Sequence, residues 1–221
     1  RKALDLDGLG ESVAIKLVET KLAASPLELF SLSLDNLANL LLDPAKSSDG
    51  LTQSKERRFG EKRANTLIKS LIKAREEMPL SRWLFAMGIS QIGESAALEL
   101  SRLHEKLSDL PESQIVADLA DLPDFAELSK SKRKKENHPR LQQYKIDDNL
   151  GPVAAQHLRT FFRSEAGQTV LEKLRELGIN PKSDNFAPDP TASTEGLRFT
   201  DKTFVITGTL SAPRQEFKKL I

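Results

Sequence analysis

The 221-residue sequence contains no cysteine, only three histidines, one tryptophan and one tyrosine. Without cysteine, the chain forms neither disulfides nor thiolate zinc sites. His104, His138 and His157 show no metal-ligand spacing, so we predict no metal site. No apolar run approaches the roughly 20 residues that a membrane-spanning helix needs, and no secretory signal is visible. We therefore expect a cytoplasmic protein without a membrane partner.

An excess of charge of either sign is also absent. The chain has 33 basic and 32 acidic residues, for a formal net charge of +1. A protein that binds nucleic acid through side-chain charge is usually more basic. Backbone amides and helix ends hold phosphates with little net charge, however. If the protein binds nucleic acid, we expect backbone groups to contribute and basic residues to be unevenly distributed.

A short pattern occurs four times, and we number its copies 1 to 4. Each copy reads apolar residue, glycine, three residues, alanine, two residues, leucine. The alanine and leucine fall four and seven residues after the glycine, on one face of a helix. This is the consensus of a helix-hairpin-helix. The four copies are Leu9, Gly10, Ala14 and Leu17; Phe59, Gly60, Ala64 and Leu67; Ile92, Gly93, Ala97 and Leu100; Leu150, Gly151, Ala155 and Leu158.

The residue types of this pattern have a physical role. The glycine is expected to turn the chain sharply and to let another backbone come close. The apolar residue before it would fill the core. The helix that follows would present backbone N–H groups that suit a phosphate. Four copies predict a surface that grips a nucleic-acid backbone without reading bases.

The copies are not identical, and a single copy is also typical of a plain helical corner. Copy 1 has a further glycine, Gly8, two residues before Gly10. Arg58, Gln91 and Asn149 replace it in copies 2, 3 and 4, which weakens their match. The matching offsets of all four copies nevertheless make a chance origin much less plausible than for one copy.

Apolar spacing predicts a mainly α-helical fold. We expect helices over 12–22, 26–30, 33–42, 61–77, 80–87 and 167–177, and short helices within 108–128. Gly178 would end the last helix, and Trp83 and Phe85 would pack in the core. The polar stretch 45–56 predicts a loop. The basic run 129–140 is interpreted as a solvated loop, with a phosphate-contacting arm as the alternative.

The end of the chain has a different pattern. Residues 181–198 contain three prolines with serine, threonine and aspartate, which is typical of a linker. Residues 202–210 (KTFVITGTL) predict a strand that ends in a glycine turn, and 215–221 would begin a helix. One strand and the start of a helix cannot form a domain, so we expect a truncated domain, and the absence of an initial methionine suggests a piece of a longer protein.

Several stretches together resemble one family. Residues 2–22 (KALDLDGLGESVAIKLVETKL), 57–72 (RRFGEKRANTLIKSLI), 79–100 (PLSRWLFAMGISQIGESAALEL) and 150–162 (LGPVAAQHLRTFF) resemble, in order, the helix-hairpin-helix domain of bacterial NAD-dependent DNA ligases. Residues 201–210 (DKTFVITGTL) resemble the opening strand of the BRCT domain that follows it. Two stretches, 43–56 and about 126–146, depart from the family pattern and are interpreted as insertions.

The resemblance implies a mainly α fold with three parts: a tandem helix-hairpin-helix domain of four hairpins over 1–180, a linker over 181–198, and the start of an α/β BRCT domain over 199–221. It implies a parent protein that uses NAD, magnesium and a structural zinc to seal nicks in duplex DNA during replication and repair. The Lys-x-Asp-Gly motif that takes AMP from NAD in this family is absent here, as are the zinc-binding cysteines. We expect this chain to be the non-catalytic C-terminal region, without a cofactor of its own, holding nicked duplex DNA as a monomer.

The resemblance also assigns residues that would face phosphates. The backbone amides after each glycine would bind, and the Lys62 and Arg63 side chains could add charge-assisted contacts. Thr207 and Gly208 match a segment that forms a phosphate pocket in some BRCT relatives, although a plain strand end is the favoured interpretation. The full set of expected DNA-binding residues is Gly8, Gly10, Glu11, Ser12, Gly60, Glu61, Lys62, Arg63, Gly93, Glu94, Ser95 and Gly151.

Two other hypotheses share part of this evidence. A helix-hairpin-helix accessory domain of another DNA repair protein has the same physics but does not predict DKTFVITGTL. A helical protein-interaction scaffold, in which the glycines are only corners, predicts no salt-dependent DNA binding. A stand-alone enzyme is disfavoured because the sequence shows no acid–base or nucleophile set.

Overall fold

A computed structural model describes residues 3–43, 47–48, 52–53, 57–122 and 141–188, and within them the chain is mainly α-helical. The α-helices are α1 (Glu11–Glu19), α2 (Leu34–Ala38), α3 (Glu61–Glu77), α4 (Leu80–Ala86), α5 (Glu94–Leu103), α6 (Gln114–Ala120), α8 (Pro152–Arg163) and α9 (Glu165–Glu176). Short 3₁₀ helices are η1 (Pro26–Ser31), η2 (Leu107–Asp109) and η4 (Gln142–Tyr144). The strands are β1 (Leu41–Asp43), β2 (Ser47–Ser48), β3 (Thr52–Gln53) and β4 (Arg57–Arg58).

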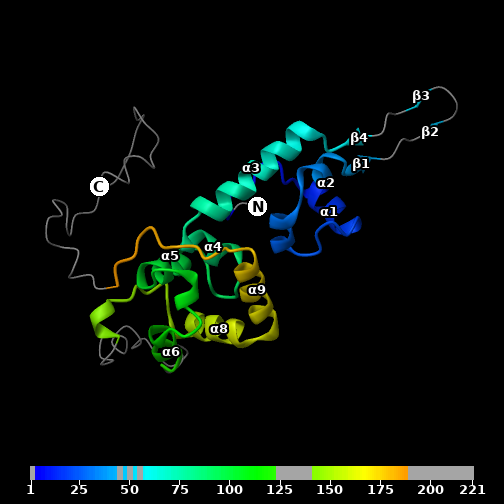
Figure 1. Cartoon of the computed structure of the whole chain (residues 1–221). Helices are drawn as coiled ribbons and strands as arrows, with labels where there is room; N and C mark the ends of the chain where they lie inside the picture. Colours follow the sequence, from blue (N-terminus) through cyan, green and yellow to red (C-terminus); the bar gives the residue numbers. More distant parts are fainter. Residues whose placement is uncertain (1–2, 44–46, 49–51, 54–56, 123–140, 189–221) are drawn as a thin grey trace, which may run out of the picture.

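The described elements form two halves, with α3 running from one towards the other (Figure 1). The N-terminal half comprises the described residues up to 77, in which α2 packs on α3 and β1 pairs with β4. The C-terminal half comprises the described residues from 78 onwards, in which α4 packs on α5 and α8 on both α6 and α9. The 3₁₀ helix η1 contacts both α3 and α9 and so connects the two halves.

The repeated pattern is a burial pattern. The apolar residue before each glycine is buried in all four copies: Leu9, Phe59, Ile92 and Leu150. The leucine seven residues after each glycine is also buried: Leu17, Leu67, Leu100 and Leu158. The alanine is buried in copies 2, 3 and 4 and partly buried in copy 1, where it is Ala14. The four-fold pattern therefore marks the core-facing side of α1, α3, α5 and α8, as predicted.

Trp83 lies in the core, as predicted. Its side chain is 2% exposed, its Nε1 donates to the Ala74 carbonyl at 3.2 Å, and its ring lies 5.5 Å from that of Phe30. The same prediction for Phe85 is wrong, because this side chain is 37% exposed. Two residues along a helix turn the side chain by about 200°, so one short helix cannot bury both.

The predicted helix over 33–42 is too long. Ser33 does cap α2, since its Oγ accepts from the Asn36 amide at 3.1 Å, but the helix ends at Ala38. The leucines that follow alternate between buried and half-buried, which suits a strand rather than a helix. Strand β1 pairs antiparallel with β4, and the Phe59 amide donates to the Leu40 carbonyl at 2.9 Å. This pairing fixes the entry into α3.

Other predicted elements compare well with the structure. The helix over 61–77 is confirmed with both ends, and those over 12–22, 80–87 and 167–177 are confirmed with small shifts at their ends. The segment 26–30 is helical but of the 3₁₀ type. Within the predicted loop 45–56, the described residues of β2 and β3 pair antiparallel. No helix of the described segments has the length and apolarity to cross a bilayer.

Gly178 ends α9 as predicted. It has a left-handed φ of 66° and donates to the Arg175 carbonyl at 3.0 Å. The Ile179 amide donates to the Leu174 carbonyl at 2.8 Å, and this pair of bonds satisfies the last carbonyls of the helix. Ile179 is itself buried. The cap therefore directs the chain back across the C-terminal half.

The chain after Gly178 is bonded to the helices of the C-terminal half. The Leu80 amide donates to the Lys182 carbonyl at 2.8 Å, and the Ala187 amide donates to the Arg102 carbonyl at 2.9 Å. The helical assembly thus includes described residues beyond 180, the predicted boundary of the linker. The basic run 129–140, the linker residues 189–198 and the predicted strand with Thr207 and Gly208 lie outside the described residues.

Candidate nucleic-acid interface

Each of the four glycines caps the N-terminus of a helix. The carbonyls of Gly10, Gly60, Gly93 and Gly151 accept from the amide of the alanine four residues later, at 3.0, 3.0, 2.9 and 3.1 Å respectively. The glycine-to-alanine spacing is therefore the first turn of the helix. Because glycine has no side-chain oxygen, no side-chain cap forms at these four ends. No N-cap side chain therefore accepts from the first amides of these helices.

The glycines do not all turn the chain in the way we expected. Gly10, Gly93 and Gly151 have φ values of −86°, −80° and −103°, in the extended region that any residue adopts. The expectation of a sharp turn at these three is wrong. Of the pattern's glycines only Gly60, with φ of 83°, is left-handed.

In copies 1 and 3 the left-handed residue stands two positions earlier. Gly8 has φ of 85°, and Gln91 has φ of 66°. Gln91 thus takes the backbone conformation of Gly8 although it is not a glycine. This position, rather than Gly10 or Gly93, makes the turn.

Gly10 and Gly93 face open space. A Cβ built on either would meet no heavy atom within 4 Å. Neither the backbone conformation nor the packing of these residues therefore requires glycine. The missing side chain leaves the adjacent helix end open to an external group, and this is the feature of a surface that receives a backbone or a phosphate.

The residues after the glycine are exposed in copies 1, 2 and 3. They include all the expected contact residues of these helix ends: Glu11 and Ser12, Glu61, Lys62 and Arg63, and Glu94 and Ser95. A glutamate at the first position favours the helix through the macrodipole but repels a phosphate. Two cations lie close by. Arg82 Nη1 lies 4.0 Å from Glu94 Oε1, and the Arg63 guanidinium lies 4.7 Å from the centre of the Phe59 ring.

Copy 4 offers fewer donors. Its first helical residue is Pro152, which has no N–H group and is buried. Its turn is held by Asp147, whose Oδ1 accepts from the Asn149 amide at 2.8 Å. Asn149 does not take the left-handed conformation of Gly8 and Gln91. Gly151 therefore stands at the helix end least suited to a phosphate.

Copies 1 and 2 lie against each other through a glycine. A Cβ on Gly8 would lie 3.4 Å from the Leu67 Cβ and 3.5 Å from the Arg63 carbonyl oxygen on α3. Next to it, the Asp7 amide donates to Ser70 Oγ at 3.2 Å. The turn of copy 1 thus packs directly on the helix of copy 2, so the two helix ends have a fixed relation.

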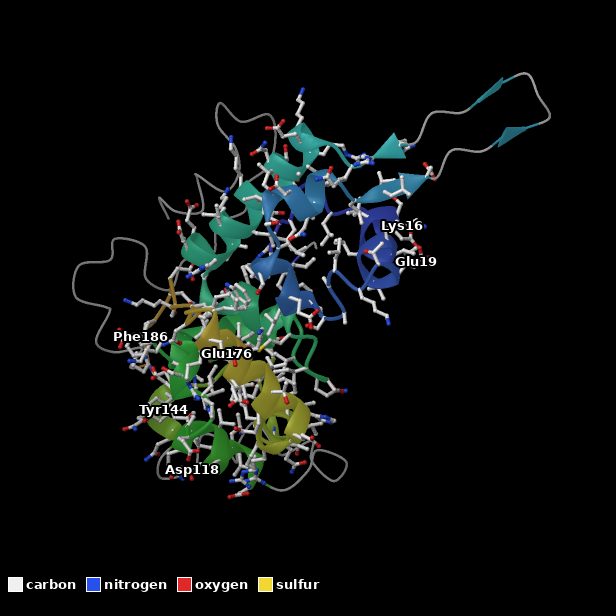
Figure 2. All side chains as sticks on the ribbon, turned by 45° about the vertical axis from the view of Figure 1, so that its right-hand side comes forward. Lys16, Glu19, Asp118, Tyr144, Glu176 and Phe186 are labelled. Carbon is white, nitrogen blue, oxygen red and sulfur yellow. The ribbon has the colours of Figure 1, made fainter. Side chains whose placement is uncertain are left out.

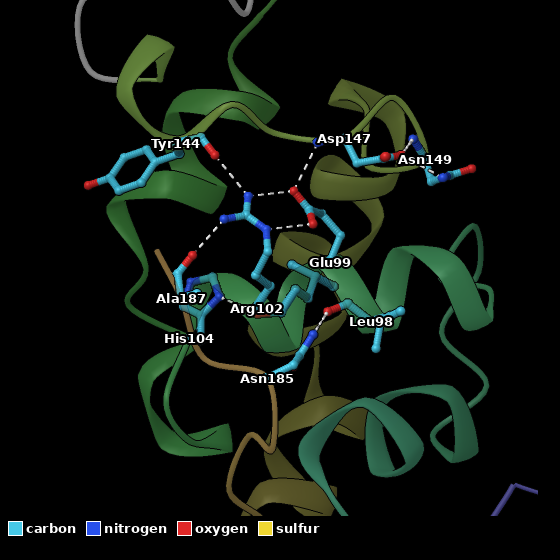
Figure 3. Close-up of polar contacts among 10 residues, drawn as sticks. Leu98, Glu99, Arg102, His104, Tyr144, Asp147, Asn149, Asn185 and Ala187 are labelled. Atoms are coloured by element: carbon cyan, nitrogen blue, oxygen red, sulfur yellow. Dashed lines mark hydrogen bonds and ion pairs between the residues drawn. The ribbon is translucent and has the colours of Figure 1, made fainter. Parts of the chain in front are cut away.

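Copies 3 and 4 are joined by an ion pair that is largely buried (Figure 3). Arg102 donates to both carboxylate oxygens of Glu99, at 2.8 and 2.7 Å, and Glu99 is 8% exposed. Glu99 Oε1 accepts from the Asp147 amide at 2.9 Å, and Arg102 donates to the Tyr144 carbonyl at 2.8 Å and the Ala187 carbonyl at 2.7 Å. The pair therefore ties α5 to the turn of copy 4 and to the chain after Gly178.

The sequence analysis did not select Glu99 or Arg102. A signal was present, because position 99 lies on the same face of α5 as the buried Ala96 and Leu103. A glutamate on a core-facing position, with an arginine three residues later, indicates a paired buried charge. These residues position the helices and do not themselves lie at the exposed helix ends.

His104 is buried and fully hydrogen-bonded. Nδ1 lies 2.9 Å from the Leu100 carbonyl and must donate to it, and Nε2 lies 2.6 Å from Ser113 Oγ. Burial lowers the pKa of His104 below its ordinary value, although the bond to Leu100 and the charge of Asp109 act in the opposite direction. His104 therefore links α5 to the Ser113 cap of α6. In the described residues, no three histidine, aspartate or glutamate side chains gather as metal ligands would.

Two known proteins are similar to the chain over its whole length. The chain is 34% identical to a protein named DNA ligase from Akkermansia muciniphila, over an alignment of 265 residues that covers all of the chain. It is 30% identical, again over its whole length, to a protein named DNA ligase from Hahella chejuensis. The chain is homologous to a segment of bacterial DNA ligases. It spans 32% and 26% of the length of these two relatives.

Both relatives are named DNA ligase, which confirms the resemblance to DNA ligases. No model of a protein family matches the chain, so the relationship rests on these full-length alignments. The four glycine-capped helix ends are the recurrent feature of the described residues, and they are the candidate interface. The ends of copies 1, 2 and 3 share open space at the glycine and exposed residues after it.

Proposed function

We propose that this chain is the DNA-gripping part of an NAD-dependent DNA ligase, located in the C-terminal region of the parent protein. Its tandem helix-hairpin-helix motifs hold the backbone of nicked duplex DNA while the catalytic domains of the parent protein seal the nick. The chain itself performs no chemical step and needs neither NAD nor a metal. The homology to proteins named DNA ligase supports the parent activity.

One observation carries the gripping role. Gly10 and Gly93 cap helices at exposed ends, have ordinary φ values, and leave empty the space that a side chain would occupy. Folding alone does not require glycine at such positions. Phosphate binding would require it, because a side chain would block the approach of a phosphate to the amides of residues 11, 12, 94 and 95. Such contacts hold any duplex and carry no sequence information.

The exposed glutamates at these helix ends are compatible with phosphate binding only if the phosphate avoids them. Glu11, Glu61 and Glu94 repel a phosphate that approaches from their own side, so the phosphate must approach over the glycine. Arg63 and Arg82 lie near two of these ends and offset the negative charge. Copy 4, with Pro152 in place of an amide donor, would contribute least.

The test is to fill the open space. We expect Gly10→Leu and Gly93→Leu variants to retain the fold, because a Cβ at either position meets no heavy atom within 4 Å and the φ values are ordinary. Loss of a hydrogen bond to a charged group costs about 1.5–3 kcal/mol, so each variant should bind duplex DNA at least about tenfold more weakly. Binding is measured by fluorescence anisotropy, and the fold by circular dichroism and thermal unfolding.

Ala166→Leu is a matched control. Ala166 is an exposed first-turn residue of α9, a helix capped by Ser164 rather than by a glycine of the pattern. This variant should bind DNA with the same affinity as the unsubstituted chain. Equal affinity of all three variants, each folded, would refute the assignment of the helix ends. The absence of duplex binding by the parent chain would favour a protein-interaction scaffold.

A further inference from the structure

Helix α3 contains more basic than acidic residues. Residues 62–75 contain five basic and no acidic residues, which leaves 28 basic and 32 acidic residues in the rest of the chain. The near-neutral composition thus conceals a basic segment of fourteen residues on α3, in addition to the basic run 129–140. Of these two, only the segment on α3 lies within the described residues, and it shows the uneven distribution that we expected from the sequence.

Three of these basic residues form a line. At 3.6 residues per turn, Lys62, Lys69 and Lys73 lie within about 40° of one another around the helix axis. All three are exposed, and they stand opposite the buried Leu67 and Leu71. We call them the α3 lysine ridge. In Figure 2, side chains with nitrogen at their tips project from α3 on the side away from α1.

The ridge is not committed to contacts within the described structure. None of its three lysines forms an ion pair with a described residue, whereas Lys16 and Lys173 elsewhere are paired with Glu19 and Glu176. The other two basic residues of this segment have different surroundings. Arg63 lies over the Phe59 ring, and Arg75 lies near Gly178.

The spaces along the ridge also carry no negative charge. The side chain on the same line between Lys62 and Lys69 is that of Thr66, whose hydroxyl donates to the Lys62 carbonyl at 3.1 Å. With a rise of 1.5 Å per residue, the lysines are about 10 and 6 Å apart along the axis. The glutamates of α3 flank the ridge at its two ends: Glu61 precedes Lys62, and Glu76 and Glu77 follow Lys73 by three and four residues.

We propose that the α3 lysine ridge is a second line of phosphate contacts for duplex DNA, continuous with the glycine-capped end of the same helix. The proposal rests on the DNA-gripping function proposed above. Lys62 belongs to both the helix end and the ridge, so a strand that reaches Gly60 can continue along Lys69 and Lys73. The ridge supplies point charges without bidentate or apolar contacts, which suits a phosphate backbone and adds no sequence preference.

The experiment compares three double variants of the whole chain. Lys69→Gln with Lys73→Gln removes two charges from the ridge, and glutamine retains helix propensity. The slope of the logarithm of the binding constant against that of salt concentration should fall by about 0.9 for each phosphate that the protein no longer neutralises. We therefore expect the slope to fall by about 1.8 in magnitude, with weaker binding at low salt. Lys69→Arg with Lys73→Arg should restore the slope.

Lys173→Gln with Arg175→Gln is the matched control, since it removes the same charge from the surface of α9. This control should leave the slope nearly unchanged. The ridge proposal is overturned if the Lys69→Gln, Lys73→Gln variant and this control change the slope equally, or if neither of them changes it. In those cases weaker binding by Gly10→Leu would leave the proposed function standing. If the unsubstituted chain does not bind duplex DNA, both the proposed DNA-gripping function and the ridge proposal are refuted.

Discussion

In the N-terminal half, the turn of copy 1 lies on α3 through Gly8 and a weak Asp7–Ser70 hydrogen bond; in the C-terminal half, the turn of copy 4 lies on α5 through the Glu99–Arg102 pair. The two halves thus use the same arrangement, in which one turn packs on the helix of the neighbouring copy. In the N-terminal half the turn is held by close packing of Gly8 on α3, and in the C-terminal half it is held by a hydrogen-bonded ion pair.

The comparison shows which part of the repeated pattern is constrained. The buried apolar residue and leucine are retained in all four copies, because they form the core. The turn and the contacts that hold it on the neighbouring helix differ between the copies, because different types of contact can hold the turn in place. We therefore predict that removal of the contacts that hold the turn lowers the free energy of unfolding much more in the C-terminal half than in the N-terminal half.

The largest effect is expected for Glu99→Ala. Removal of one partner of a buried ion pair leaves the other charge uncompensated and costs about 3 kcal/mol or more. The Asp147 amide also loses its acceptor. Ser70→Ala, the corresponding change in the N-terminal half, should cost only about 0.5–1 kcal/mol, the value of one exposed hydrogen bond. Urea denaturation measures both, and equal losses in the two variants would show that the halves are fastened alike.

A smaller effect is expected at the two left-handed positions. Gly8→Ala should lower the free energy of unfolding by about 1–2 kcal/mol, because an L-residue is strained there. Its Cβ would also press on Leu67. Gln91→Gly should instead stabilise the chain, by about 0.5 kcal/mol once the greater freedom of glycine in the unfolded state is subtracted. Thermal unfolding of the two variants should move in opposite directions; a loss of stability in both would contradict this account of the turn.

The third effect is a pH dependence confined to the C-terminal half. Burial lowers the folded-state pKa of His104, so below the unfolded-state pKa of about 6.5 the unfolded chain binds a proton that the folded chain does not. Stability from this group is therefore complete above that pH and falls as the pH drops towards the folded-state pKa. His104→Gln should therefore reduce the dependence of the free energy of unfolding on pH below about 6.5, relative to the unsubstituted chain. An unchanged dependence in this variant would contradict the burial argument.

The sequence predicted the features that depend on burial. The period of apolar residues located α3 with both ends, and the four-fold pattern identified the core-facing side of four helices. Gly178 was recognisable because a helix end that needs a left-handed residue favours glycine. Each of these signals is local and repeats along the chain.

The features that depend on contacts between distant segments were not predicted. Leu41 belongs to a strand because Arg58 of β4, seventeen residues later, pairs with it. Glu99 is satisfied by Arg102 on its own helix and by the Asp147 amide, 48 residues later. Neither β4 nor Asp147 is evident as a partner from the sequence around Leu41 or Glu99.

The central claim is that this segment grips the backbone of duplex DNA. The most direct measurement is the affinity of the chain for duplexes of unrelated sequence, nicked and intact, and for single-stranded DNA, from about 50 to 200 mM salt. The account predicts duplex binding that falls steeply with salt and does not depend on sequence. Binding that is absent at low salt, or that depends on sequence but not on salt, would contradict it.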